Sequence, residues 1–586
     1  MQKEFNSLTK NDILEINSTL DISNKYIENN KFNLAINILK DAEKKFNNIP
    51  EIFYNIAISN FLQAKEFFEK QNYLLAKSFY KKAESYFLLA KNDKFLSAIY
   101  INLSICYQHF KNYSAMKLYH EKIANLNPKP EFSDALLSYS KLCCADWEGL
   151  DEILDRAYKE LKKNISSIRP FTCMLVTDDP ELQYFSAVNF CNKYINSNDN
   201  INYDYKKNIN HKKIKIAYLS SDFHNHATAH LIAGIFEKQD NQKFDYYALS
   251  YGVNNDNSEI SLRLKKSFSN FFDVTDKTDK DIELLLRELE IDIAVDLKGH
   301  TKENRIQILK NKPCPIQISY LGFPGTLGTN FIDYLILDEF IVNKENRKFF
   351  KENIIYLPDC YQCNDEKKPK LIKFTRKELH LPEDKIILCS LNNTHKYNKK
   401  LFDVWVDILK KNKNTVLWLL DDKAIKDNIY DYFNKQDIKN NQIILSPKVE
   451  TQTHLSRLAL ADLFLDSFPC NAHTTASDAL FANLPIITLA GKSMSSRVSS
   501  SLLNTIGLDD LVSSNIEEYK KKINFYIKNK KELKKLRKKI EQKKFEKLFN
   551  SETFIKNLEL AYTNAWAKFK NGNKIADIFI SKGENL

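Results

Sequence analysis

The chain has 586 residues, which is too long for one hydrophobic core, and a usual domain size of about 100–200 residues predicts three or four units. Hydrophobic residues make up 43% of the chain, with only 14 Pro and 11 Gly, which excludes a disordered or fibrous protein. The first residues lack the apolar core of a signal peptide, and no stretch offers about 18 uninterrupted apolar residues. Ten cysteines are too sparse for a disulfide framework. We therefore expect a globular, cytoplasmic protein with no membrane span.

The formal net charge is +12, and the densest basic run lies at residues 520–547. Apolar residues recur in this run at near-helical spacing, which indicates a helix with a solvated basic face. We expect no nucleic-acid partner. Contact with a membrane surface or a nucleic acid is the alternative interpretation of this run.

Residues 1–130 predict helical repeats. Similar amphipathic segments begin at Phe32, Tyr73 and Tyr113, so the spacing is 41 and then 40 residues. Each segment has an alanine two or three positions after its aromatic residue, where a small side chain lets two helices approach closely. The pattern resembles tetratricopeptide repeats, whose groove usually binds a polypeptide, and a purely structural helical layer is the alternative. Residues 131–212 then predict a helical connector.

From residue 213 onward, short apolar strands alternate with amphipathic helices, the pattern of a doubly wound α/β sheet. The first lobe, 213–360, has expected strands at Ile214–Leu219, Phe244–Tyr251, Ile291–Leu297, Ile316–Tyr320 and Tyr334–Leu337. The second lobe, 375–550, has expected strands at Ile386–Ser390, Val416–Leu420, Ile443–Leu445, Leu463–Asp466 and Ile486–Leu489 and a helix at Leu401–Lys410. Residues 551–586 predict a helical tail. Two such lobes bind a ligand in the cleft between them, at the carboxyl ends of their strands.

The strongest local feature is the segment 466–478, which lies between an expected strand and a helix that starts near Thr474. Backbone N–H groups and hydroxyl side chains at a helix start form a ready site for a pyrophosphate. Asp478, one turn into the helix, is placed to accept a hydrogen bond from a ribose hydroxyl. A capping role for Thr474 and Thr475 is the alternative.

Three histidines, His224, His226 and His230, lie directly after an expected strand where a helix opens. Asp222 is the only acidic or thiol neighbour of these histidines, so we expect no metal site. A histidine at a strand end beside a helix start is suited to orient or deprotonate a hydroxyl group. A structural role for His224 and His230 is the alternative.

Lys396 follows the first expected strand of the second lobe. A lysine at that position can offset the charge that builds on a departing diphosphate, as Mg²⁺ often does, whereas an ordinary solvated lysine is the alternative.

Glycines concentrate in 322–328, a loop through which backbone can approach a ligand closely. Cys360 and Cys363 form a lone C-x-x-C pair, which we interpret as structural.

Four segments taken together resemble the protein O-linked N-acetylglucosamine transferase family, in particular its bacterial members: 218–230, 321–326, 391–396 and 470–475. The resemblance runs in order over about 210–510, and the repeats fit it as well. It implies a GT-B fold of two Rossmann-like lobes behind an all-α arm, as in glycosyltransferase family 41. It also implies inverting transfer of N-acetylglucosamine, or a related hexose, from a UDP-sugar to Ser or Thr of a protein, with no metal or other cofactor.

The resemblance implies a role for individual residues too. His226 corresponds to the acceptor-side histidine and candidate base, and Lys396 to the residue that stabilises the leaving diphosphate. The implied UDP- and sugar-binding residues are Leu321, Gly322 and Cys470 near the sugar, His473, Thr474 and Thr475 at the pyrophosphate and sugar, Asp478 at the ribose, Val449 and Arg457 at the uracil, and Asn393 and His454 near the nucleotide.

The chain departs from the animal members in three ways. Thr451 and Asn393 stand where those enzymes have a ribose-binding lysine and a glutamine, and their large domain between the lobes is absent. Two other functions stay open at this point. One is glucosylation of Asn by relatives built on the same lobes, whose pyrophosphate segment lacks His-Thr-Thr. The other is a catalytically silent repeat scaffold that binds proteins.

Overall fold

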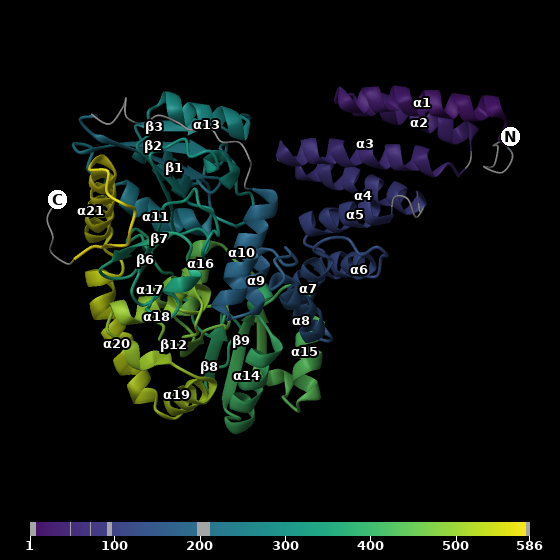
Figure 1. Cartoon of the computed structure of the whole chain (residues 1–586). Helices are drawn as coiled ribbons and strands as arrows, with labels where there is room; N and C mark the ends of the chain where they lie inside the picture. The colour runs from purple at the N-terminus through teal and green to yellow at the C-terminus, as the bar shows by residue number, and fades with distance from the viewer. Residues whose placement is uncertain are drawn as a thin grey trace. The chain divides into compact units, whose positions relative to one another are not determined.

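A computed structural model describes residues 8–46, 48–70, 72–90, 96–195, 205 and 211–581 (Figure 1). The chain divides into two compact units, Met1–Cys144 and Ala145–Leu586. Across the described ranges, no helix is long and apolar enough to cross a membrane. Part of the expected connector, 196–204 and 206–210, lies outside the described residues.

The first unit is all-helical in its described residues. Its helices are α1 (Lys10–Glu28), α2 (Phe32–Lys45), α3 (Pro50–Glu69), α4 (Tyr73–Leu89), α5 (Leu96–His109), α6 (Tyr113–Ala124) and α7 (Ser133–Cys143). The expected repeat openings at Phe32, Tyr73 and Tyr113 are the first residues of α2, α4 and α6. The side chains of Asn72 and Asn112 accept hydrogen bonds from backbone N–H groups in the first turns of α4 and α6, which explains why these helices start there.

Helices that are neighbours in the chain pack on one another in this unit. Ala35 and Ala76 are completely or almost completely buried, as the small-residue pattern predicts, whereas Met116 takes the equivalent buried position in the third repeat. Helix α7 packs on α6, so the unit extends to Cys144 and not only to residue 130, where the repeat pattern ends.

The second unit begins with helices α8 (Leu150–Leu161), α9 (Pro170–Val176) and α10 (Pro180–Tyr194). Trp147, just before α8, donates a hydrogen bond from its indole to the carbonyl oxygen of Tyr397 at 3.3 Å. Its ring packs against Phe402 and Tyr432. The start of this helical segment is therefore attached to the second α/β lobe.

The first lobe is a sheet of parallel strand pairs in the order β14-β7-β6-β5-β4-β1-β2-β3. Its strands are β1 (Ile214–Ser220), β2 (Phe244–Ser250), β3 (Asn270–Asp273), β4 (Ile293–Asp296), β5 (Ile316–Ser319), β6 (Tyr334–Asp338), β7 (Asn353–Leu357) and β14 (Ile578–Phe579). Helices α11 (Ala227–Phe236), α12 (Glu259–Ser267) and α13 (Asp279–Glu288) connect the strands. The sequence pattern missed β3, which is short and half-buried, and β7 at the other side of the sheet.

The C-terminal tail returns to the first lobe. Helix α21 (Ser551–Lys570) packs near α11 and β7, and the Tyr562 hydroxyl lies 3.0 Å from that of Tyr218 on β1. Strand β14 then pairs with β7. Helix α21 lies in the expected helical tail, whereas β14 was not predicted, because this strand completes a sheet edge whose partner lies more than two hundred residues earlier.

The second lobe is also a parallel sheet, with the order β10-β9-β8-β11-β12-β13. Its strands are β8 (Ile386–Ser390), β9 (Thr415–Leu420), β10 (Ile443–Ser446), β11 (Leu463–Leu465), β12 (Ile486–Leu489) and β13 (Val512–Ser513). Its helices are α14 (Lys399–Lys411), α15 (Lys426–Lys435), α16 (Thr451–Leu458), α17 (Thr474–Phe481), α18 (Val498–Thr505), α19 (Ile516–Lys528) and α20 (Lys530–Lys547). Two parallel α/β sheets confirm the predicted two-lobe architecture.

The basic run at 520–547 spans two helices, α19 and α20, that are separated at Asn529. Ile523, Leu533 and Ile540 are buried, and most lysines between them are exposed. The run is thus helical, with buried apolar residues and a basic outer face as predicted, but it forms two helices and not one.

Candidate functional site

The carboxyl ends of β1, β2, β4 and β5 meet at one edge of the first sheet. The turns there are packed so closely that a Cβ at Gly252 would lie 1.9 Å from the carbonyl oxygen of Ser221, and one at Gly322 would lie 2.1 Å from that of Leu297. Leu321 has a φ of 68°, the left-handed region. Gly322 is therefore required by the neighbouring strand, and the turn brings Leu321 and Gly322 to this edge.

A buried ion pair lies at the same edge. The Lys298 ammonium contacts both carboxylate oxygens of Asp222 at 2.8 Å, and both side chains are buried. Nδ1 of His226 lies 3.4 Å from Oδ2 of Asp222. Burying either charge alone would be costly, so each requires the other. Sequence reasoning missed Lys298, whose only local signal is its position just after β4.

His226 caps helix α11. Its Nδ1 accepts a hydrogen bond from the backbone N–H of Thr228 at 3.2 Å. Burial lowers the pKa of His226, Asp222 acts in the opposite sense, and Lys298 lowers it further. The imidazole is therefore neutral at pH 7. When Nδ1 accepts this hydrogen bond, the proton of the neutral ring is on Nε2. Nε2 can act as a base only in the other tautomer, in which Nδ1 holds the proton and donates a hydrogen bond to Asp222.

The two neighbouring histidines have partners within the protein. His224 Nδ1 lies 3.0 Å from the carbonyl oxygen of Ser221, and His230 Nε2 lies 2.9 Å from Oδ1 of Asn225. Among the residues that the structure describes, no three His, Cys, Asp or Glu side chains are grouped as a metal site needs. The structural interpretation of His224 and His230 fits these contacts.

In the second lobe, helix α17 starts at the carboxyl end of β11. Oδ1 of Asp466 accepts hydrogen bonds from the backbone N–H groups of Ser467 and Ala472 at 2.8 and 2.7 Å, which folds the intervening segment back on the strand end. His473 is the N-cap residue, and it makes no side-chain cap hydrogen bond. Thr474 and Thr475, both half-buried, follow. The first turn therefore presents N–H groups to an anion.

Lys396 lies beside this helix start. It ends a short 3-10 helix, Thr394–Lys396, and its ammonium donates to the carbonyl oxygen of Asn471 at 2.5 Å. Burial, together with the positive charge of Lys396, lowers the pKa of His473 to about 3. Burial raises the pKa of the Cys470 thiol, whereas Lys396 lowers it. The lysine and the helix start thus concentrate positive potential at one point.

Helix α16 supplies a second group of predicted residues. The Arg457 guanidinium donates to Nδ1 of His454 at 3.3 Å and to the carbonyl oxygen of Pro447 at 2.7 Å. Burial lowers the pKa of Arg457 to about 10 and that of His454 to about 4. Among the described residues, the buried Nε of Arg457 has no hydrogen-bond partner. Val449 lies half-buried between β10 and this helix.

Asp478, on α17, has a partner that the sequence analysis did not predict. Its Oδ1 lies 2.5 Å from the ammonium of Lys368, which comes from the segment that joins the two lobes. Helices α16 and α17 contact each other, so Asp478 and His454 belong to one end of the candidate site. Asn393, by contrast, is exposed before the 3-10 helix of Lys396.

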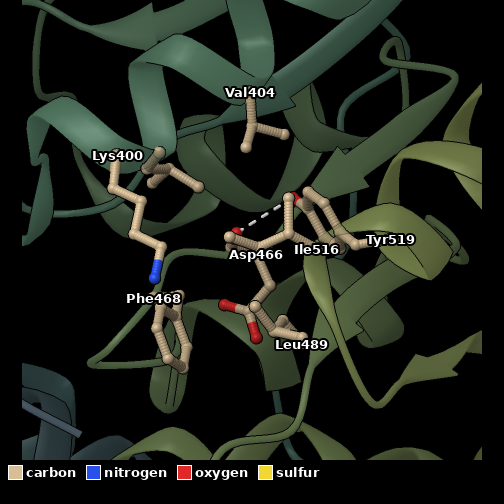
Figure 2. Close-up of a pocket in the computed structure, with 8 residues that line it drawn as sticks. Lys400, Val404, Asp466, Phe468, Leu489, Ile516 and Tyr519 are labelled. Carbon is tan, nitrogen blue, oxygen red and sulfur yellow. Dashed lines mark hydrogen bonds between the residues drawn. The ribbon is translucent and has the colours of Figure 1, made fainter.

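A small pocket of mainly apolar lining lies next to the Asp466 strand end (Figure 2). The Tyr519 hydroxyl donates to the carbonyl oxygen of Asp466 at 3.1 Å, and Phe468 and Lys400 lie at one side of the pocket. A wider hollow of about 530 Å³ shares Lys400, Phe468, Leu489 and Ile516 with it. None of the predicted donor-binding residues lines either hollow, so both are separate from the candidate site.

Two parallel α/β lobes, with a helix that starts at the strand ends of the second, are the architecture of the GT-B class. A solved O-GlcNAc transferase mutant of Thermobaculum terrenum has the same fold, with a TM-score of 0.68 and 18% sequence identity, covering 96% of this chain and 100% of that one. Residues 149–370 and 362–558 match the family model of glycosyl transferase family 41. The chain belongs to that family, as its motifs predict.

Curated relatives match about three fifths of the chain. The probable UDP-N-acetylglucosamine–peptide N-acetylglucosaminyltransferase SEC of Arabidopsis thaliana is 35% identical over 371 residues, which is 61% of this chain and 37% of that protein. The probable transferase SPINDLY of the same plant is 28% identical over 372 residues, 62% of this chain and 40% of that protein. The matched region thus spans about two fifths of each relative's length.

Proposed function

We propose that the chain is an inverting, metal-independent glycosyltransferase that moves N-acetylglucosamine, or a related hexose, from a UDP-sugar to Ser or Thr of a protein. One observation carries the proposal: the uncapped start of α17 lies beside the ammonium of Lys396. Membership of family 41 and the names of the plant relatives support the same reaction class.

The proposed donor site lies on the second lobe. The diphosphate binds the N–H groups at Thr474 and Thr475, and Lys396 stabilises the negative charge that appears as UDP leaves. Asp478 accepts a hydrogen bond from a ribose hydroxyl, and the uracil lies toward Val449 and Arg457. The positive charge comes from the lysine and the helix start, so the proposed step needs no metal ion.

The proposed acceptor group binds from the first lobe. Its hydroxyl oxygen bonds to the anomeric carbon on the face opposite the diphosphate, while the bond from that carbon to the phosphate oxygen breaks and its electron pair leaves with UDP. The acceptor proton passes to a base. His226, neutral at pH 7 and 43% exposed, is the proposed residue that orients the hydroxyl or takes the proton.

The proposed acceptor is a polypeptide, because the relatives are named as peptide transferases. The helical repeats of the first unit are the proposed binding surface for it, since stacked helix pairs offer a continuous surface to an extended chain. A photoreactive acceptor peptide should cross-link to α2–α6 of the full chain, and cross-links confined to the catalytic unit would contradict this part of the proposal.

Transfer is testable directly. Purified protein is incubated with a panel of UDP-sugars and candidate acceptor proteins, UDP release is measured, and modified residues are mapped by mass spectrometry. We expect N-acetylglucosamine on Ser or Thr and no effect of EDTA. Modification of Asn in place of Ser or Thr would show N-transfer and contradict the proposed O-transfer. Strong inhibition by EDTA would contradict metal independence. Absence of UDP binding would reject the proposal as a whole.

A further inference from the structure

The segment that joins the two lobes contributes a buried charge to the candidate site. The Lys368 side chain is 6% exposed, and its ammonium lies 2.5 Å from Oδ1 of Asp478, which is 15% exposed. The same ammonium lies 5.6 Å and 5.8 Å from the ring centroids of Phe481 and Phe549. A lysine held against a carboxylate and between two rings has lost its rotamer freedom, so its position is defined.

The residues just before Lys368 contact the other lobe. The Lys367 ammonium lies 2.7 Å from a carboxylate oxygen of Glu237, at the end of α11, and Asp365 accepts a hydrogen bond from Arg263 at 2.8 Å. Lys367 and Lys368 thus pair with carboxylates on opposite lobes. The chain crosses from the first lobe to the second between these two residues.

After Lys368, the segment runs along α16. The carbonyl oxygen of Lys370 accepts a hydrogen bond from the Gln452 amide at 2.9 Å, and the backbone N–H of Ile372 donates to the Ser456 hydroxyl at 2.9 Å. These contacts fix the segment at α16 and α17, the two helices of the proposed nucleotide end. Burial lowers the pKa of His454, and Lys368 contributes to the same lowering, which places its charge near this end.

We propose that Lys368 is a positioning residue of the nucleotide subsite, which holds one carboxylate oxygen of Asp478 so that the other accepts a hydrogen bond from a ribose hydroxyl. This inference rests on the proposed function. A carboxylate that can rotate loses part of its hydrogen-bond energy in ordering, whereas one clamped by an ammonium is already oriented when the ribose arrives.

A solely structural ion pair is the competing explanation, and it makes a different prediction. Such a pair would tie the segment to α17, and its removal would change stability without distinguishing one nucleotide from another. Lys368→Met removes the charge and keeps most of the side-chain volume, which matters because the stem of Lys368 lies against aromatic rings. Lys367, which is the preceding residue and is 58% exposed, provides a matched control with the same loss of charge.

The test is calorimetric titration of the full chain and its Lys368→Met, Lys368→Arg and Lys367→Met variants with UDP and with 2′,3′-dideoxy-UDP. We expect Lys368→Met to weaken UDP binding about tenfold, the range of one charge-assisted hydrogen bond, and to leave binding of the dideoxy analogue unchanged. Lys368→Arg should restore most of the affinity, and Lys367→Met should bind UDP as the unaltered chain does. Equal weakening toward both nucleotides, or no weakening toward UDP, would overturn the inference.

Asp478→Asn provides a second route should Lys368→Met fail to fold. It should likewise weaken binding of UDP and leave binding of the dideoxy analogue unchanged. The double variant with Lys368→Arg should lose no further UDP affinity, because the two residues act as one unit. In turnover assays, Lys368→Met should raise KM for the UDP-sugar with kcat nearly unchanged. If the unaltered chain binds no UDP, the proposed function fails; if it binds UDP and Lys368→Met does too, only this inference fails.

Discussion

Helices α11 and α17 each start just beyond the carboxyl end of a parallel strand, β1 and β11, yet their first turns differ. In α11, the His226 side chain caps the N–H of Thr228. In α17, His473 makes no side-chain cap. The side chain of His226 therefore satisfies the helix start of the first lobe, whereas in the second lobe the first-turn N–H groups are available for the proposed ligand.

The lysines near the two helix starts differ in the same way. Lys298 is buried against both carboxylate oxygens of Asp222, so its charge is neutralised within the first lobe. Lys396 donates to a backbone carbonyl, that of Asn471, which leaves a net positive charge. The second lobe is therefore the proposed binding site for an anion and the first lobe for a neutral group, and the predictions below test that difference.

The largest effect is expected for Lys396→Ala. Removing the charge that stabilises the departing UDP should lower kcat by about 10³-fold, whereas UDP binding should weaken far less. Steady-state turnover and calorimetry separate the two effects. Lys400→Ala is the control, because Lys400 lines the separate hollow near Phe468. Unchanged turnover in Lys396→Ala would contradict the leaving-group role.

Replacing His226 separates its capping from its chemistry. Asn is a good N-cap residue, so His226→Asn should keep the stability of α11 and still lower kcat about 10²-fold. His226→Ala should show the same loss of turnover, and its free energy of unfolding should also be about 1 kcal/mol lower. Thermal unfolding and turnover of both variants provide the measurements. Full activity in His226→Asn would exclude a role for the imidazole in proton transfer.

A side-chain cap on α17 should make the second lobe resemble the first. His473→Asp introduces a carboxylate that can accept from the free N–H groups, so it should weaken UDP binding about tenfold more than His473→Ala does. Binding of UDP is measured by calorimetry for both variants. Equal affinities would show that the N–H groups of this helix start do not bind the diphosphate.

The smallest effect is a dependence of stability on pH. His300 is buried a few residues after β4, where its Nε2 lies 2.9 Å from the carbonyl oxygen of Leu327. Burial lowers the pKa values of His454 and His300 to about 4, and that of His473 to about 3, whereas each is near 6.5 in the unfolded chain. Between pH 6.5 and about 4 the unfolded state binds more protons, so stability falls as pH falls through this window. We expect a loss on the order of 1 kcal/mol per histidine between pH 7 and 5, measured by chemical denaturation. His300→Gln should reduce the slope.

Sequence periodicity predicted the central strands well. Strands β8 and β12 lie at the predicted residues, because a buried parallel strand is a continuous apolar run that can be recognised locally. The edge strands β13 and β14 were missed, since each has two residues and exists only through pairing with a neighbour. The helix starts at Thr474 and near His226 could also be predicted from local sequence, because each comes shortly after an apolar strand.

The amino-acid sequence by itself determined the two-lobed α/β architecture, the repeated helices before it and the positions of His226, Lys396 and Thr474, since each depends on neighbours within a turn or a strand. Only the tertiary structure decided which charges meet. Lys298 pairs with Asp222 across 76 positions and Lys368 with Asp478 across 110. Such partners are brought together by sheet order and by the path of the joining segment, which no local pattern encodes.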